Sequence, residues 1–432
     1  MNNNTLKLKQ LPDGWIKLPL ISCCSLIKDG THGTHKRLNT GIPLLSAKNI
    51  TESGNIFWDE SDSFISEIEY KTIHSKYELE NDDLLLTVVG TLGRRALVKK
   101  NYCFTIQRSV AVLRCDKNYL ISRYLYHFSA SHYFQRQLVI RSNSTAQAGL
   151  YLGELEKIEI AIPKITEQQK IVEILDAIDK AIALTDTHIT KLKKAKAGLL
   201  HDLLTRGIDE HGELRDYTRN PELFKRSLLG IIPKDWDVEP LQKHTFSSAF
   251  GPRFSSSLYA DDGNVATLRT TDMDEEGNLD LSTMPLAHLN LGLFNLHILE
   301  VGDLLISRSG TCGITAVFPG FNIPVLPGAF LIRFRLKESV KAEFIRRYFN
   351  YELGRARVLN EAEGGVQKNL RGSTLLKLLI PIPPKQEQDA IIYRLQCYES
   401  RIITRKICIE KLKLLKKGLM SDLLTGRVRV KI

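Results

Sequence analysis

Two stretches of the chain repeat apolar residues at steps of three and four, or at steps that sum to seven. Such spacing places the apolar side chains along one face of an α-helix, as in the seam of a helix pair. Two polar residues interrupt each seam, Thr185 and Lys196 in the first and Arg405 and Lys416 in the second. The predicted seam residues are Ile171, Leu175, Ile178, Ile182, Ile189, Leu192, Leu199 and Leu203, and, 220 residues later, Ile391, Leu395, Tyr398, Ile402, Ile409, Leu412, Leu419 and Leu423.

The pattern also predicts where these helices begin and end. Thr166 with Gln169 is typical of a capping box at the first start, and Gly207 and Gly426 stand where helices stop. A helix from Thr166 to Thr205 would be about 60 Å long at about 1.5 Å per residue. One exposed seam of that length is unstable alone, so we expect the two helices to bury each other in antiparallel fashion. The alternative is that each helix folds back on its own domain.

Other segments repeat at nearly the same offset, which indicates a duplicated chain. Between the repeated segments, residues 21–80 and 242–300 show no clear likeness. The matching pairs are "LPDGWIKLPL" with "IPKDWDVEPL", "DDLLLTVVGTLG" with "GDLLISRSGTCG", and "IAIPKITEQQKIVEIL" with "IPIPPKQEQDAIIYRL".

Each half also predicts short strands and further helices outside the long ones. The expected strands are "IPLLSAKNI", "DLLLTVVG", "SVAVLRC", "VATLRTTDM", "DLLISRSG" and "FLIRFRL", and the expected helices are Arg123–Leu138 and Glu343–Leu359. The sequence therefore predicts an α+β fold in which two mixed α/β domains are separated by two long helices packed as an antiparallel coiled coil, with a pseudo-two-fold internal repeat. The expected boundaries are 1–163 for the first domain, 164–206 for the first helix, 207–230 for a linker, 231–383 for the second domain and 384–425 for the second helix.

Composition narrows the class of protein. The 432 residues are 43% hydrophobic and 25% charged, and the formal net charge is +11. A basic balance of this size indicates either a solvated basic surface or a polyanion partner, and nucleic acid is the commonest polyanion in the cytoplasm. No apolar run is long enough to span a bilayer, and the first residues lack the apolar segment of a signal peptide, so we expect a cytoplasmic protein. Seven cysteines without a C-x-x-C pair predict no disulfide framework.

Motifs of common enzymes are missing. The chain has no phosphate-binding Walker loop, no dinucleotide fingerprint, no H-E-x-x-H and no G-x-S-x-G. Asp62, Glu69 and Lys71 superficially resemble a nuclease set, which a chain with so many charges produces by chance. Cys23 and Cys24 with two nearby histidines favour a plain loop over a zinc site, because adjacent cysteines rarely suit tetrahedral zinc. We therefore expect neither a catalytic residue nor a metal on this chain.

What remains is recognition. Two basic modules held by long helices suit duplex DNA, whose groove faces recur at about 10 base pairs. Because residues 21–80 and 242–300 differ in sequence between the two halves, the expected DNA target is asymmetric and bipartite, with a gap set by the helices. The candidate contacts are polar or basic residues near shared turns, since arginine can read guanine, asparagine or glutamine adenine, and hydroxyl groups phosphate. They are Lys48, Asn49, Thr87, Thr91, Arg94, Arg95, Gln107 and Arg108, and Arg253, Arg269, Thr270, Ser307, Arg308, Ser309, Thr311 and Arg333.

Two further groups of residues align between the halves. Gly90, Gly93, Gly310 and Gly313 are expected in turns that need a positive φ. Gln147 and Gln367 would either touch DNA or bond a domain to its helix, and the sequence leaves both roles open.

At this point the chain resembles one family, the specificity subunits of type I restriction-modification enzymes. "KDGTHGTHKRLNTGIPLLSAKNI" is similar to the start of a target recognition domain in that family, and "VVGTLGRRALV" and "SRSGTCGITAVF" are similar to its glycine-turn segment. "KAKAGLLHDLLTRG" and "LKKGLMSDLLTGRV" are similar to the ends of its helical regions. The second half lacks the Asp-Gly-Thr-His signature and has "SSAFGPRFSSS" there, which implies a different target sequence.

The resemblance implies several properties. Each recognition domain would read half of a split site in double-stranded DNA. The helices would bind two adenine methyltransferase subunits that use S-adenosylmethionine, and nuclease–translocase subunits that use ATP and magnesium would join them. No cofactor and no catalytic residue would belong to this chain.

Three other interpretations stay open at the level of sequence. The chain could serve a type II system whose methylase and nuclease are fused, and the co-purifying partner would distinguish this. A coiled-coil adaptor without a DNA role would show no steep loss of DNA binding with added salt. A stand-alone nuclease would cut plasmid in the presence of magnesium.

Overall fold

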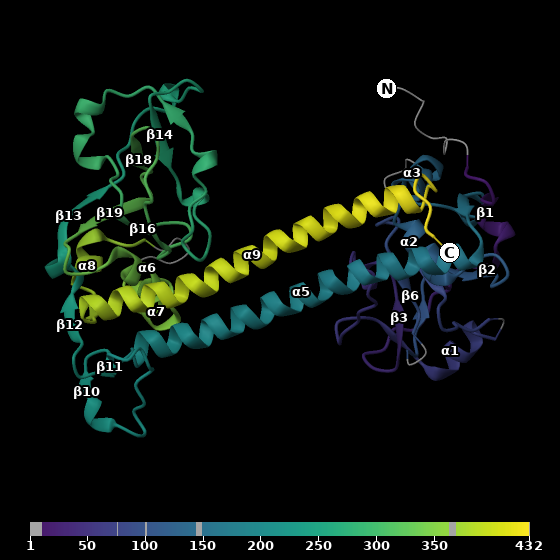
Figure 1. Cartoon of the computed structure of the whole chain (residues 1–432), viewed down its shortest axis with the longest axis horizontal. Coiled ribbons are helices and arrows are strands. Elements are labelled where there is room, and N and C mark those ends of the chain that lie inside the picture. Colours follow the sequence, from purple (N-terminus) through teal and green to yellow (C-terminus); the bar gives the residue numbers. More distant parts are fainter. Residues whose placement is uncertain (1–10, 76, 100–101, 144–148, 363–368, 432) are drawn as a thin grey trace. The chain divides into compact units, whose positions relative to one another are not determined.

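The computed structural model describes residues 11–75, 77–99, 102–143, 149–362 and 369–431. The chain forms two compact units: unit 1 comprises residues 1–187 and 406–432, and unit 2 comprises residues 188–405. Two long helices, α5 (Ile165–Thr205) and α9 (Lys385–Leu423), each begin in one unit and end in the other (Figure 1). The compact units therefore divide inside the helices, whereas the sequence pattern places the expected boundaries at the helix ends.

Packing within each unit confirms the predicted antiparallel pairing. In unit 1, Ile171 near the start of α5 shares a core with Leu423 at the end of α9. In unit 2, Leu203 near the end of α5 shares a core with Ile391 near the start of α9. All sixteen predicted seam residues are buried or partly buried. The alternative in which each helix packs only on its own domain is thereby excluded.

The helix ends are partly as predicted. Gly207 and Gly426 have φ angles of +61° and +71° just beyond the two helices, as expected. The capping role of Thr166 is wrong, because α5 begins at Ile165 and Thr166 lies inside its first turn. The carbonyl of Lys164 accepts the backbone N–H groups of the first turn instead.

Unit 1 contains a four-stranded antiparallel sheet and a smaller three-stranded sheet. The larger sheet has the strand order β2-β8-β5-β6, and the smaller one has the order β4-β3-β7. The first strand of the domain, β1, pairs with the last one, β9. The strands are β1 (Ile16–Pro19), β2 (Cys24–Asp29), β3 (Ile42–Leu45), β4 (Phe64–Ile65), β5 (Leu84–Thr87), β6 (Arg95–Leu97), β7 (Thr105–Ile106), β8 (Val110–Cys115) and β9 (Glu159–Ile162), and the shorter helices are α1 (Glu67–Ile73), α2 (Ser122–Ser129), α3 (His132–Arg141) and α4 (Leu152–Leu155).

Unit 2 repeats this arrangement. Its sheets have the orders β13-β19-β16-β17 and β15-β14-β18, and β12 pairs with β20. The strands are β12 (Asp237–Pro240), β13 (Thr245–Phe250), β14 (Val265–Leu268), β15 (Leu286–Ala287), β16 (Leu304–Ser307), β17 (Thr315–Val317), β18 (Val325–Pro327), β19 (Leu331–Leu336) and β20 (Leu379–Ile382), and the shorter helices are α6 (Ala342–Asn350), α7 (Glu352–Asn360) and α8 (Gly372–Lys377).

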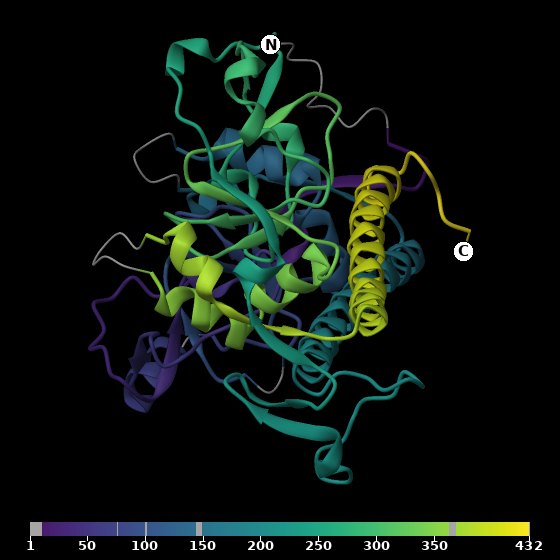
Figure 2. The ribbon, with the colours of Figure 1, turned by 90° about the vertical axis from the view of Figure 1, so that its left-hand side faces the viewer.

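The segment predicted as a linker carries its own structure. Strands β10 (Phe224–Ser227) and β11 (Gly230–Pro233) form a two-stranded antiparallel hairpin. Figures 1 and 2 both show this hairpin apart from the larger sheets of unit 2. Among the described residues of unit 1, no hairpin stands at the corresponding place.

The regions without sequence likeness nevertheless fold alike. Strands β3 and β14 each pair antiparallel with one neighbour and parallel with the other. A short 3₁₀ turn follows each strand, Ala47–Asn49 in unit 1 and Thr270–Asp272 in unit 2. The side chain of the last residue in each turn accepts the backbone N–H of the residue three positions earlier: Asn49 accepts from Ser46, and Asp272 accepts from Arg269. The structural duplication therefore extends into the regions that share no sequence likeness.

The two shorter predicted helices are each split in two, so that part of the prediction is wrong. The first breaks into α2 and α3 because Ser131 adopts an extended backbone and its hydroxyl accepts the N–H of Phe134, which caps α3. The second breaks into α6 and α7 at Tyr351, which is also extended. Gly354 lets α7 approach α6, since a Cβ there would lie 1.9 Å from the carbonyl oxygen of Tyr348.

Among the described residues, no helix has both the length and the apolar character that crossing a membrane requires.

Candidate nucleic-acid interface

The larger sheet of each unit gathers most of the predicted contacts at one edge. In unit 1, β2 and β5 end at this edge and β8 begins there, with Asp29 opposite Ala111 and Thr87 opposite Val110. In unit 2, β13 and β16 end and β19 begins in the same way, with Phe250 opposite Ile332. We call these the recognition edge of unit 1 and the recognition edge of unit 2.

Glycine turns follow β5 and β16 at these edges, as the repeat predicts. Gly90, Gly93, Gly310 and Gly313 all have φ between +75° and +83°. A residue with a Cβ is strained at such angles, so the turn shape depends on glycine.

Several predicted contacts lie open at the recognition edge of unit 1. Thr91 and Arg108 are exposed and Gln107 is partly exposed. Lys48 is also exposed, although its Nζ lies 2.7 Å from Asp62 Oδ1. Burial alone would raise the pKa of Asp62, but hydrogen bonds from Lys48 and Asn49 lower that pKa below its ordinary value. The turn that carries Lys48 lies against the start of β8, because Ala47 N–H donates to Ser109 Oγ.

Unit 2 presents a corresponding group. Arg253 and Thr311 are exposed, and Ser309 and Thr270 are partly exposed. Arg269 is 44% exposed but forms an ion pair with Asp272 at 2.7 Å. Arg308 directly follows β16 and is partly exposed.

Other predicted contact residues are buried within the domain. Thr87 Oγ1 accepts the N–H of Arg94, and Ser307 Oγ accepts the N–H of Ile314, so the same bond closes the glycine turn in both units. Asn49 is 3% exposed and Arg333 is 3% exposed. These four side chains are buried, so they are not exposed at the recognition edges.

Two arginines of unit 1 are also engaged internally. Arg94 Nη1 donates to the carbonyl of Ile50 at 3.4 Å. Arg95 Nε donates to the carbonyl of Tyr126, and its guanidinium lies 5.0 Å from the centre of the Tyr126 ring. Both side chains are partly exposed. Their bonds connect the glycine turn of unit 1 to Ile50 and to α2.

Gln147 and Gln367 lie outside the described residues. The nuclease-like set does not converge, because Asp62 pairs with Lys48 and Lys71 pairs with Glu67.

Sequence reasoning missed an organised loop in unit 1. His32 Nε2 lies 2.6 Å from Asp29 Oδ2, and His35 Nε2 lies 2.6 Å from Thr31 Oγ1. Gly30 packs against the backbone, since a Cβ there would lie 2.1 Å from the carbonyl oxygen of Ile106. The Asp-Gly-Thr-His signature was the available signal: the small residue fixes the loop and the polar residues bond across it.

A buried glutamate anchors the first turn of each long helix. Glu167 accepts from Trp15 Nε1 at 3.2 Å and from Arg429 at 2.7 and 2.8 Å. Glu387 accepts from Trp236 Nε1 at 3.0 Å and from Arg215 at 2.6 and 3.1 Å. The repeated Glu-Gln pair in the two Pro-bounded segments was the sequence signal for this anchor.

The arginines of the two anchors come from matching places. Arg215 lies in the segment after α5, and Arg429 lies in the segment after α9. The segment that leaves one long helix therefore bonds to the glutamate that begins the other.

The seam lysines face a second polar cluster in each unit. In unit 1, Lys416 pairs with Asp179, and the buried His127 lies 2.7 Å from Asp176 Oδ1 and 4.0 Å from Asp179 Oδ2. Burial lowers the pKa of His127 to about 4, although Asp176 acts to raise it. Arg123 also pairs with Asp176, so both carboxylates already have basic partners in this potential three-ligand group.

In unit 2 the corresponding cluster holds a permanent cation. Lys196 pairs with Glu399 at 3.1 Å, and Arg347, at the place of His127, pairs with the same Glu399 at 3.0 Å. These clusters explain why lysine interrupts both seams at matching positions.

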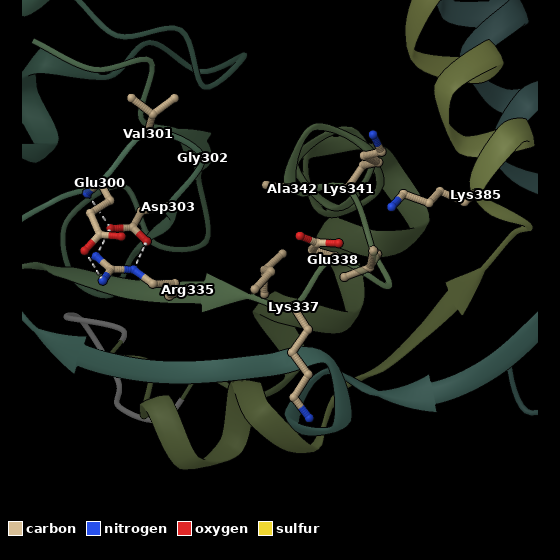
Figure 3. Close-up of a pocket in the computed structure, with 12 residues that line it drawn as sticks. Glu300, Val301, Gly302, Asp303, Arg335, Lys337, Glu338, Lys341, Ala342 and Lys385 are labelled. Atoms are coloured by element: carbon tan, nitrogen blue, oxygen red, sulfur yellow. Dashed lines mark hydrogen bonds and ion pairs between the residues drawn. The ribbon is translucent and has the colours of Figure 1, made fainter.

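A cavity of about 450 Å³ lies in unit 2, away from the recognition edge. Figure 3 shows Glu300 and Asp303 bonded to Arg335 on one side, with Lys341 and Lys385 on the other. Asp303 precedes β16 and Arg335 lies near the end of β19, so the cavity is at the opposite edge of the sheet.

Comparison with known proteins agrees with the duplicated architecture. The family described as "Type I restriction modification DNA specificity domain" matches residues 28–194 and 233–413. A putative type I restriction enzyme MjaX specificity subunit from Methanocaldococcus jannaschii is 26% identical over all of this chain and 97% of its own length. The type I restriction enzyme EcoKI specificity subunit from Escherichia coli is 22% identical over 90% of this chain and 82% of its own.

Solved structures show the same fold. A chain from a study of complex assembly and conformational transition in a type I R-M system superposes with a TM-score of 0.62 at 17% identity, covering 97% of this chain and all of that one. The S subunit from M. genitalium superposes with a TM-score of 0.54 at 17% identity, covering 98% and 97%. With two copies of the domain on one repeated scaffold, this chain belongs to the type I restriction-modification DNA specificity family.

Proposed function

We propose that this chain is the sequence-reading subunit of a type I restriction-modification complex and that each unit reads one half of a split DNA site. The observation that carries this proposal is the pair of recognition edges: the same strands and glycine turns present different side chains in the two units. A repeated scaffold with unlike edges suits a target whose halves are unlike. Subunits of this family confer specificity, and the reactions belong to other subunits.

Part of the binding would be electrostatic. The net charge is +11, and Arg108 and Arg253 lie exposed near the recognition edges. Side chains of this kind bind phosphate groups, and the counterions that they displace make affinity fall steeply as salt rises. We therefore expect binding to random duplex DNA to weaken strongly with added salt, which an adaptor without a DNA role would not show.

The partners would be two adenine methyltransferase subunits and nuclease–translocase subunits. S-adenosylmethionine, ATP and magnesium would belong to them. In unit 1, α9 exposes the apolar side chains of Ile407, Leu414 and Leu415. Exposed apolar groups of this kind mark contact surfaces, and we assign them to a methyltransferase subunit. Leu414→Asp should then weaken co-purification of that subunit while the chain stays folded.

The two long helices would set the gap between the half-sites. Removing one heptad from both α5 and α9 keeps the seam in register, because the apolar pattern repeats every seven residues. We expect the gap in the recognised site to change and both half-site sequences to stay the same. An unchanged gap with retained binding would contradict this role of the helices.

Methylome sequencing of cells that express this chain with its partner subunits tests the proposal directly. The expected result is one adenine-modified motif made of two unlike halves separated by unspecified bases. Loss of the motif when the gene for this chain is deleted completes the test. A continuous motif, or one that persists without this chain, would overturn the proposal.

A further inference from the structure

Three side chains of unit 2 form a fixed group at its recognition edge. Arg308 Nε donates to Asn369 Oδ1 at 3.1 Å, and the Arg308 guanidinium lies 4.7 Å from the centre of the Phe250 ring. Phe250 is the last residue of β13, and Arg308 directly follows β16. The bond and the ring hold a flexible side chain in one orientation before any ligand arrives.

Backbone bonds fix the group to the sheet. Arg308 N–H donates to the carbonyl of Phe330, and Leu370 N–H donates to the carbonyl of Arg308. Phe250 is 43% exposed and Phe330 is 55% exposed, so the edge around Arg308 is open to a ligand.

The free polar atoms of this group are all donors. Within the part of the chain that the structure describes, the two Nη groups of Arg308 and Nδ2 of Asn369 have no bonded partner. Asn369 Oδ1 accepts from Arg308 Nε and thereby orients the guanidinium. The Arg308 guanidinium has no acceptor and offers only N–H donors to a base.

Guanine matches such a group best. Its major-groove edge offers two acceptors, O6 and N7, which a planar guanidinium can bind together. Cytosine presents a donor there, and adenine presents a donor beside its acceptor.

The same positions in unit 1 carry different chemistry. Val88 makes the backbone bonds that Arg308 makes in unit 2, and its side chain is buried. Gly149 precedes Leu150 as Asn369 precedes Leu370, and Asp29 ends β2 as Phe250 ends β13. The donor group is therefore specific to unit 2.

We propose that Arg308, oriented by Asn369 and Phe250, reads a guanine in the half-site of unit 2 and that unit 1 has no equivalent reader at these positions. This inference rests on the proposed function, because it assigns a base to a half-site that unit 2 is proposed to read. Arg308 would contact the base, while Asn369 and Phe250 act as positioning residues.

The test compares Arg308→Lys with the wild type in the full complex with methyltransferase subunits, with the methylated motif as the readout. Lysine keeps the positive charge but cannot bind O6 and N7 as a planar pair. We expect a guanine at one position of one half-site to lose its preference by about tenfold or more, with the other half-site unchanged. Arg226→Lys is the matched control: this exposed arginine of the same unit lies in β10, on the hairpin apart from the larger sheets, and its replacement should leave every base preference intact.

Three outcomes decide the inference. A preference lost at one guanine supports it. An unchanged motif overturns it. A uniform weakening on all sequences also overturns it and makes Arg308 a phosphate contact. A wild-type complex that shows no split motif would sink the proposed function itself, so the two failures are distinguishable.

A second measurement works on the DNA. Replacing the affected guanine with 7-deazaguanine removes its N7 acceptor without changing the pairing. Wild-type affinity should fall several-fold, whereas the affinity of Arg308→Lys should not change further. Equal losses for both proteins would show that Arg308 does not contact N7.

Discussion

Unit 1 and unit 2 share the bonds that fix their shape and differ in the side chains at their recognition edges. Both begin a long helix with a glutamate that accepts from a tryptophan and an arginine, and both close the glycine turn with the same hydroxyl bond. At the recognition edges, by contrast, Asp29 and Val88 of unit 1 stand where unit 2 has Phe250 and Arg308. A scaffold that fixes its own shape through buried bonds leaves its edge free to vary, which a protein that reads unlike half-sites requires.

The buried clusters under the helix pair also differ in one respect. Unit 1 has a neutral histidine, His127, where unit 2 has Arg347. The two clusters hold their long helices with groups that respond differently to pH and to the loss of a partner.

Removing the glutamate that anchors a long helix should have the largest effect on the stability of a unit. Glu387→Ala leaves Arg215, 9% exposed, without its main partner in a buried site, and should lower the opening free energy of unit 2 by about 3–5 kcal/mol. Glu167→Ala should destabilise unit 1 less, because Arg429 is 44% exposed and can turn to water. Hydrogen exchange of β20 and β9 measures the two losses separately.

Glu387→Gln serves as the control for that comparison, because it keeps an acceptor for Trp236 and removes only the charge. Equal losses for the two alanine variants would contradict the importance of Arg215 burial.

The histidine gives unit 1 a pH dependence that its counterpart Arg347 does not give unit 2. The pKa of His127 is about 4 in the fold and about 6.5 when unfolded, so between these values the unfolded chain binds more protons. The stability of unit 1 should therefore fall by about 3 kcal/mol as the pH drops from about 6.5 to about 4. His127→Gln should remove this part of the loss in exchange experiments, while the contribution of nearby Asp176 and Asp179 persists.

Replacing the seam lysines Lys416 and Lys196 should change the stability of the two units by smaller and unequal amounts. Lys416→Met leaves Asp179 without the cation that pairs with it and with the neutral His127 4.0 Å away, which should cost about 1 kcal/mol. Lys196→Met leaves Glu399 still paired with Arg347, so its cost should be near zero. Denaturation monitored in each unit by exchange checks the order, and a larger loss for Lys196→Met would contradict this account.

Removing the aromatic support at the recognition edge should have the smallest effect. Phe250→Leu keeps apolar packing but removes the ring beneath Arg308, an interaction of about 0.5–1 kcal/mol. The guanine preference of unit 2 should fall two- to fivefold, with the half-site of unit 1 unchanged. A binding titration on matched and guanine-substituted duplexes measures this, and an equal change in both half-sites would show that the effect is not local.

The sequence by itself determined the duplicated plan, the two long helices and their seam, because these depend on local periodicity and on repeated residues. It also predicted the glycine turns, since only glycine adopts their positive φ without strain. It did not show that residues 21–80 and 242–300 share a fold, because what those regions conserve is a pattern of bonds. Asn49 and Asp272 make the same capping bond with different side chains.

Only the tertiary structure decided which polar residues remain available at the edges. The sequence does not distinguish the buried polar residues from exposed ones such as Arg308 and Thr91, because all of them are polar or basic residues near shared turns. The buried and bonded residues are Thr87, Ser307, Asn49 and Arg333. The partners that separate them come from distant parts of the chain, as Asn369 does for Arg308 and Ser247 for Arg333. Such pairings follow from strand order and register, which no local pattern encodes.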